Sequence, residues 1–151
     1  MTRAFADQVA GWRYPPPFDT YDVDGPEVDH LLRPDYRYQI VWEGETGIGY
    51  CCFGADARVP GGDYSSDALD VGWGMRPDLT GHGHGRAFVG AIVEFALDAY
   101  RPAGLRVTIA EFNTRSQRAA ASGGGFTLER DRFTAADGMR FIILERDPGP
   151  N

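Results

Sequence analysis

The stretch that decides the fold is residues 69–86, Leu-Asp-Val-Gly-Trp-Gly-Met-Arg-Pro-Asp-Leu-Thr-Gly-His-Gly-His-Gly-Arg. Residues 69–76 have the alternation of a strand, with large apolar side chains on one face and Asp70 with two glycines on a nearly bare face. Glycines inside a strand indicate a bulge, or a ligand that lies against the backbone. Pro77 then ends the strand.

The loop that follows, residues 80–86, places three glycines at alternate positions directly before an apolar helical pattern that runs from Gly83 to Tyr100. Free amides and the helix dipole make such a helix start a natural place for a phosphate, although a flexible turn would have the same composition. The spacing is not that of a dinucleotide loop. The chain has no lysine, so a Walker loop is excluded as well.

These residues resemble the acyl-CoA loop of the GNAT superfamily of N-acetyltransferases, which usually reads Arg/Gln-x-x-Gly-x-Gly/Ala. Gly83 and Gly85 occupy the glycine positions, whereas Thr80 stands where the family has Arg or Gln. The similarity continues through Asn113-Thr114-Arg115-Ser116 to Gly125-Phe126. The resemblance implies acetyl-CoA as co-substrate and a set of coenzyme contacts: Trp73, Gly74, Met75, Thr80, Gly81, His82, Gly83, His84, Gly85, Arg86, Asn113 and Ser116.

Length and composition predict a single domain over residues 1–151. It has 42% hydrophobic and 25% charged residues and no apolar run long enough for a membrane span. The N-terminus lacks a signal-peptide core, which favours a cytoplasmic protein. The net charge of −7 argues against nucleic acid as the main partner and suits a cationic substrate. Neither a membrane partner nor a metal is expected, and a homodimer is left open.

The remaining segments predict a helix at 4–12, strands at 36–42 and 46–53, a strand at 105–110, a helix from Asn113 to about Ser122, and a final hairpin of 126–134 with 139–146. Residues 19–30 are expected to be a loop or an acidic rim for an ammonium group. The neighbouring Cys51 and Cys52 should face opposite sides of their strand without a disulfide.

This order predicts an α/β (α+β) fold with a mixed, mostly antiparallel sheet, one splayed parallel strand pair and flanking helices. It resembles the GNAT architecture, but the family's first strand has no counterpart ahead of the helix at 4–12. Ligand binding belongs where the parallel pair splays.

The chemistry predicted is direct attack of a primary amine on acetyl-CoA, with a catalytically silent acyl-CoA-binding module as the alternative. Asp70 is the candidate general base and the backbone near Gly74 and Met75 the candidate oxyanion donor. In many family members a tyrosine acts as the general acid that protonates the coenzyme thiolate. This chain has Ala120 or Ala121 at that position, so water or Ser122 would deliver the proton. Candidate substrate contacts are Tyr14, Tyr50, Asp56, Arg58 and Tyr64.

Overall fold

A computed structural model describes residues 1–147, and its centre is one six-stranded sheet in the order β1-β2-β3-β4-β6-β5. The β3–β4 pair is parallel and every other neighbouring pair is antiparallel, which confirms the predicted mixed sheet. The strands are β1 Gln39–Glu43, β2 Thr46–Phe53, β3 Leu69–Met75, β4 Leu105–Ala110, β5 Phe126–Thr134 and β6 Arg140–Arg146.

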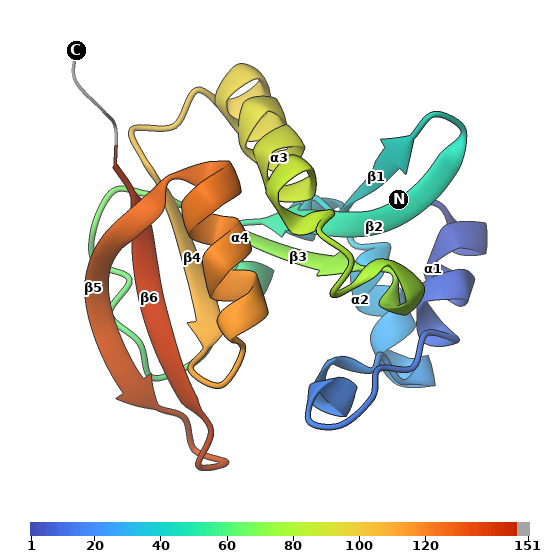
Figure 1. Ribbon diagram of the computed structural model, residues 1–151, viewed down its shortest axis with the longest axis horizontal. Helices are drawn as coiled ribbons and strands as arrows, with labels where there is room; N and C mark the ends of the chain where they lie inside the picture. The colour runs from blue at the N-terminus through green and yellow to red at the C-terminus, as the bar shows by residue number, and fades with distance from the viewer. Residues whose placement is uncertain (148–151) are drawn as a thin grey trace.

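Helices cover both faces of the sheet (Figure 1). On one face, α3 (Gly85–Tyr100) and α4 (Thr114–Gly124) pack on the main core, which includes Cys51 of β2. Tyr50, the residue before Cys51 on β2, points to the opposite face of the sheet. There α1 (Arg3–Ala10) and α2 (Val28–Leu31) form a second hydrophobic cluster. Both cysteines are buried and free, as expected.

Five short 3-10 turns connect these elements: Phe18–Tyr21, Gly25–Glu27, Pro34–Tyr36, Ala55–Ala57 and Pro77–Leu79. Two of them, with α2, occupy most of the segment 19–30 that was expected to be a loop. The polar composition misled the prediction, because Val28 and Leu31 are buried against Phe5 and Val9 of α1.

The other predicted elements differ from the structure only at their ends. Helix α3 begins at Gly85 and not at Gly83, since Gly81 and Gly83 have φ of 75° and 84°, which a right-handed helix does not allow. Within residues 1–147 no strand precedes α1, which agrees with the expected lack of the family's first strand, and β1 forms one edge of the sheet.

The parallel pairing of β3 with β4 is short. It joins Leu69 to Leu105, Asp70 to Arg106 and Val71 to Val107, after which the two strands diverge (Figure 1). Backbone hydrogen bonds between neighbouring strands require a separation of about 4.8 Å, so the divergence leaves the inner edges of both strands open. This opening positions the site described below.

A buried ion cluster joins the two strands just before they diverge. The Asp70 carboxylate accepts hydrogen bonds of 2.7 Å from Nε and from Nη2 of Arg106, and both side chains are 1% exposed. Arg58, from the loop after β2, donates a third bond of 2.7 Å to the same carboxylate. The bonds to Asp70 raise the pKa of Arg106 above its usual value, so the guanidinium stays charged.

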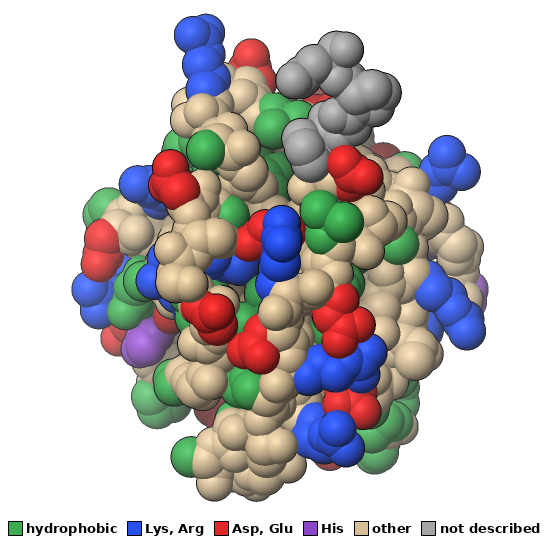
Figure 2. Space-filling view, turned by 90° about the vertical axis from the view of Figure 1, so that its left-hand side faces the viewer, with side chains coloured by type: hydrophobic (Ala, Val, Ile, Leu, Met, Phe, Trp, Pro, Cys, Tyr) green, Lys and Arg blue, Asp and Glu red, His purple; other side chains and the backbone are tan. Residues whose placement is uncertain are grey.

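The outer face of the β5–β6 hairpin carries interspersed arginines and carboxylates (Figure 2). Ion pairs there join Arg130 to Glu145, Arg132 to Glu129 and Arg140 to Glu111. Such mixed charge is typical of a solvated surface and not of a basic face that binds nucleic acid. None of the helices within residues 1–147 is long and apolar enough to cross a bilayer.

Asp70→Asn should lower the free energy of unfolding by about 3 kcal/mol or more, because it leaves the buried Arg106 cation without its counter-charge. Denaturant unfolding measures the loss. The matched control is Asp67→Asn, an exposed acid three residues away, which should change stability by less than about 0.5 kcal/mol. Equal effects of the two substitutions would show that the cluster does not stabilise the strand pair.

Candidate active site

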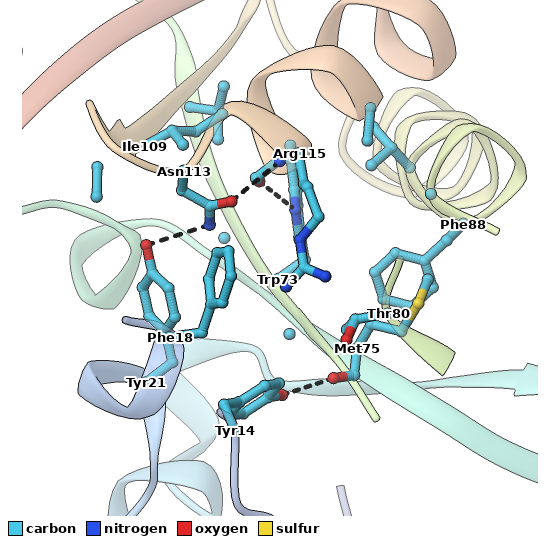
Figure 3. Close-up of a pocket in the computed structure, with 18 of the residues that line it drawn as sticks. Tyr14, Phe18, Tyr21, Trp73, Met75, Thr80, Phe88, Ile109, Asn113 and Arg115 are labelled. Carbon is cyan, nitrogen blue, oxygen red and sulfur yellow. Dashed lines mark hydrogen bonds between the residues drawn. The ribbon is translucent and has the colours of Figure 1, made fainter. Parts of the chain in front are cut away.

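A cavity of about 320 Å³ lies between the diverging ends of β3 and β4. Its walls come from the strand ends, the loop before α3, the start of α4 and the N-terminal segment 13–22, which we call the arm (Figure 3). Aromatic rings dominate the lining: Tyr14, Phe18, Tyr21, Tyr50, Trp73, Phe88 and Phe141.

The backbone of β3 presents unpaired groups to this cavity. Hydrogen-bonding direction alternates along an antiparallel pair, and Asp70 O and Arg76 N both bond to the β2 side, at 2.9 Å to Gly54 N and Ile48 O. Trp73 and Met75 therefore point their amide and carbonyl groups the other way, where β4 has moved off. The Tyr14 hydroxyl confirms this direction, since it donates a 2.6 Å bond to the Met75 carbonyl.

The same alternation corrects one prediction about the oxyanion donors. Gly74 directs its backbone toward β2, so the candidate donors facing the cavity are the amides of Trp73 and Met75.

The glycines of β3 make room for neighbouring side chains, which differs from the bulge or ligand contact that was expected. A Cβ on Gly74 would lie 2.5 Å from Cζ of Tyr50, and one on Gly72 would lie 3.1 Å from Sγ of Cys52. Protein side chains therefore cover part of this bare face, although Gly72 and Gly74 also line the cavity.

The start of α4 closes the opposite wall of the cavity. Oδ1 of Asn113 accepts a 3.1 Å bond from the Ser116 amide and so caps the start of α4, and its Nδ2 donates to the Tyr21 hydroxyl at 3.2 Å. Ser116 Oγ accepts from Trp73 Nε1 at 3.2 Å. The side-chain amide of Gln117 donates to the carbonyls of Ala110 and Glu111.

The loop before α3 contributes Thr80, Gly81 and Gly85 to the lining. Thr80 cannot replace the missing Arg or Gln as a donor, since its hydroxyl already donates a 2.7 Å bond to the Pro77 carbonyl. The α3 amides lie at the positive end of a 16-residue helix, which favours an anion.

Three tyrosine hydroxyls lie at the cavity, and burial is the main cause that raises the pKa of Tyr14, Tyr21 and Tyr50. These phenols therefore stay protonated at neutral pH and can donate hydrogen bonds but cannot act as bases. The Tyr14 hydroxyl donates a hydrogen bond to the Met75 carbonyl, and the Tyr21 hydroxyl accepts one from the Asn113 side chain. Tyr50 lies over Gly74 and makes no side-chain hydrogen bond within residues 1–147, so its hydroxyl is free to donate.

The structure brings together most of the predicted coenzyme residues. Those that line the cavity are Trp73, Gly74, Met75, Thr80, Gly81, Gly85, Asn113 and Ser116. His82, Gly83, His84 and Arg86 lie on the exposed surface of the loop and the first turn of α3, outside the lining. Whether any of them contacts a coenzyme stays a prediction.

The predicted catalytic pair is not at the cavity. Asp70 is 1% exposed, its carboxylate accepts hydrogen bonds from Arg58 and Arg106, and it does not line the cavity. Ser122 is exposed on α4 and does not line the cavity. Sequence alternation gave the correct strand face for Asp70 but could not show that Arg106, the facing residue on β4, would occupy it.

Two of the predicted substrate contacts, Tyr14 and Tyr50, line the cavity and the other three do not. Asp56 accepts a bond from the Tyr38 hydroxyl, and Arg58 binds Asp70. Tyr64 lies behind the wall, where its hydroxyl accepts a 2.9 Å bond from the Val59 amide and shares a 2.8 Å bond with Thr108.

Neither alanine at which the family tyrosine was expected lines the cavity. Ala120 is 0% exposed in the core and Ala121 faces solvent, whereas Ala119 is the alanine of α4 that lines the cavity. Sequence reasoning missed Phe18, Tyr21 and Arg115 as lining residues. Arg115 lies inside the Asn113–Ser116 motif that carries the family resemblance, and this position was a signal that could have predicted it as a site residue. The arm carried no comparable signal.

A sequence profile described as an acetyltransferase (GNAT) domain matches residues 4–125. The chain belongs to this family. No curated protein matches the GNAT chain. Solved structures resemble it in fold at low identity, and one is AAC(6')-Ib in complex with ribostamycin and coenzyme A, with a TM-score of 0.74, 15% identity and coverage of 98% of this chain and 90% of that chain.

Two further solved structures show the same fold. A putative GnaT-family acetyltransferase from Bordetella pertussis has a TM-score of 0.69 and 18% identity, with 97% of this chain and 92% of that chain covered. A spermidine N-acetyltransferase SpeG chimera from Vibrio cholerae and hSSAT has a TM-score of 0.66 and 12% identity, with coverage of 97% and 92%. At these identities the likeness establishes the fold only.

Gly74→Ala should destabilise the protein by about 1–3 kcal/mol, because the new methyl group and the Tyr50 ring cannot share the space over β3. The ring would be displaced into the cavity, so ligand binding should weaken as well. Thermal or denaturant unfolding checks the first effect. Gly25→Ala is the control, since a Cβ at Gly25 meets nothing within 4 Å. A fully stable Gly74→Ala protein would contradict the packing described.

Proposed function

We propose that this protein transfers the acetyl group of acetyl-CoA to a primary amine that binds in the same cavity. The observation that carries the proposal is the cavity itself. In a GNAT chain it joins the unpaired backbone of β3 to the glycine loop at the start of α3. Acetyl-CoA needs both surfaces, the strand backbone for its thioester end and the helix start for its anionic diphosphate.

The coenzyme side fits the residues present. Gly81 and Gly85 allow a phosphate to approach the α3 amides closely, and the Trp73 carbonyl, which faces the cavity, can accept a hydrogen bond from an amide of the pantetheine arm. The AAC(6')-Ib structures hold coenzyme A or acetyl-CoA according to their descriptions, which supports the same co-substrate here.

The acceptor side lies against the arm. Tyr14, Phe18 and Tyr21 form an aromatic wall there, and Asp22 approaches it closely enough to accept a 2.9 Å bond from the Tyr14 amide. Aromatic faces and nearby carboxylates both attract cations. An amine is therefore a suitable acceptor, and the aminoglycoside and spermidine enzymes of similar fold support this class of substrate.

The chemistry rests mainly on placing the amine and the thioester side by side, which can lower the barrier by several kcal/mol (about 7–11 at most). The amides of Trp73 and Met75 face the cavity and would stabilise the negative charge that develops on the acetyl oxygen. Tyr50 takes the place of Asp70 and Ser122 in this proposal. Burial raises the pKa of this phenol, so it would keep its proton and donate a hydrogen bond to the reacting group or to the departing thiolate.

Acetyl transfer should be measured as thiol release from acetyl-CoA with a panel of primary amines that includes spermidine and kanamycin. Among residues 1–147, the titratable side chains that line the cavity are three tyrosines with raised pKa and Arg115, so none can accept the amine proton near pH 7. Since an ammonium has no lone pair, kcat/KM should fall about tenfold per pH unit below the pKa of the amine itself. That pKa is about 10.4 for an alkylamine of lysine type and about 7.7–8.0 for an α-amine.

The acidic limb of the plot of kcat/KM against pH should thus shift with the pKa of the amine, because no group of the enzyme sets it. A fixed acidic limb, identical for amines of different pKa, would reveal an enzyme base and contradict this account. If acetyl-CoA raises the melting temperature by mass action but no amine releases thiol, the chain is a silent acyl-CoA-binding module.

Tyr50→Phe should lower kcat at least tenfold while the KM for acetyl-CoA changes little, because only the hydroxyl is removed and one hydrogen-bond donor to developing charge contributes about 10²–10³-fold. The control is Tyr38→Phe, which removes a neighbouring hydroxyl that is bound to Asp56 and lies outside the cavity lining. Equal kcat values for both variants and the wild type would remove Tyr50 from the chemistry.

A further inference from the structure

Arg115 occupies an unusual place at the mouth of the cavity. It is the second residue of α4, lines the cavity and directs its guanidinium across the opening toward the loop before α3 (Figure 3). A Cβ built on Gly81 would lie 2.9 Å from Nη1 of Arg115, so the guanidinium lies against the backbone of that loop. A side chain from α4 thus reaches the site where the α3 amides begin.

The chemistry of the surroundings leaves this guanidinium free for an anion. Its Cζ lies 4.0 Å from the ring centroid of Phe18, a contact that holds the plane of the group but uses none of its N–H donors. The ion pairs formed within residues 1–147 do not include Arg115. Five donors in a fixed planar fork therefore remain beside the helix start.

The loop itself lacks a comparable donor. Thr80 stands where an Arg or Gln was expected, and its hydroxyl is committed to the Pro77 carbonyl at 2.7 Å. The backbone amides of the loop can donate hydrogen bonds to a diphosphate, but they carry no full positive charge to balance it. The guanidinium of Arg115, at Gly81, supplies that charge from a different element of the fold.

We propose that Arg115 binds the diphosphate of the coenzyme and replaces the side-chain donor missing at Thr80, with Phe18 as the platform that positions it. The inference rests on the proposed function, since it names a residue of the same coenzyme site. Arginine is suited to this role because its paired N–H groups match two phosphate oxygens. Phe18 belongs to the arm, so the same stacking contact connects the coenzyme to the acceptor wall.

Calorimetry with three ligands tests the assignment: coenzyme A, dephospho-coenzyme A, which lacks only the 3′-phosphate, and acetyl-pantetheine, which lacks the diphosphate. Arg115→Gln should weaken both coenzyme A and dephospho-coenzyme A about 10- to 100-fold, the value of a charge-assisted phosphate contact, and leave acetyl-pantetheine unchanged. Arg118→Gln is the matched control, an exposed arginine one turn further along α4 and outside the lining; it should change none of the three.

Two more variants test the positioning by Phe18. Arg115→Lys keeps the charge but loses the planar fork, so it should recover only part of the affinity. Phe18→Leu should weaken coenzyme A several-fold in the wild type and hardly at all in the Arg115→Gln protein, because the platform acts through the guanidinium.

Several results would overturn the proposal. An equal loss for acetyl-pantetheine would mean that Arg115 only holds the fold of α4. A loss confined to coenzyme A, with dephospho-coenzyme A unaffected, would assign Arg115 to the 3′-phosphate instead of the diphosphate. Unchanged binding of all ligands would exclude any contact. The proposed function fails separately, if the wild-type protein binds neither coenzyme A nor acetyl-CoA.

Discussion

The salt bridge between Asp70 and Arg106 is the interaction on which the rest of the site depends. It joins facing residues of the parallel strands one position before their last paired residues, Val71 and Val107. Up to that point the strands are held together, and beyond it they are free to separate. A buried pair of this kind adds little net stability compared with apolar residues, but it costs much to break, so it fixes where the opening begins.

The opening explains why the glycines, tyrosines and amides of this chain are placed as they are. Gly74 makes room for Tyr50, and the alternation of β3 turns the backbone of Trp73 and Met75 into the cavity. The helix starts at α3 and α4 complete the walls. Each of these features is local in the sequence, yet they act together only because β4 departs from β3 after a fixed register.

Much of the fold follows from the sequence, because it depends on local signals. Alternation placed β2, β4 and β5, and Asn113 marked the start of α4, with errors of up to three residues at other ends. The site was less predictable. Asp70 looked available because no local rule pairs residues that are 36 positions apart, and no local rule shows that Ala119, and not Ala120 or Ala121, lines the cavity. The arm was missed for the same reason, since only tertiary contacts bring Phe18 and Tyr21 to the cavity.

The two side walls of the cavity are attached with very different strength. Behind one wall, the Tyr64 hydroxyl bonds to Thr108 of β4 and to the Val59 amide, and its ring lies 5.0 Å from Cζ of the buried Arg106. The arm is tied across the opening by two tyrosine hydroxyls, Tyr14 on Met75 and Tyr21 on Asn113. The arm also packs Phe18 and Tyr21 on Phe112, but none of its contacts holds strands together, so its local opening would leave the sheet intact and cost less than global unfolding. Amide hydrogen exchange would then divide this small domain into a slow sheet and a fast arm, with the cavity widening through the faster part.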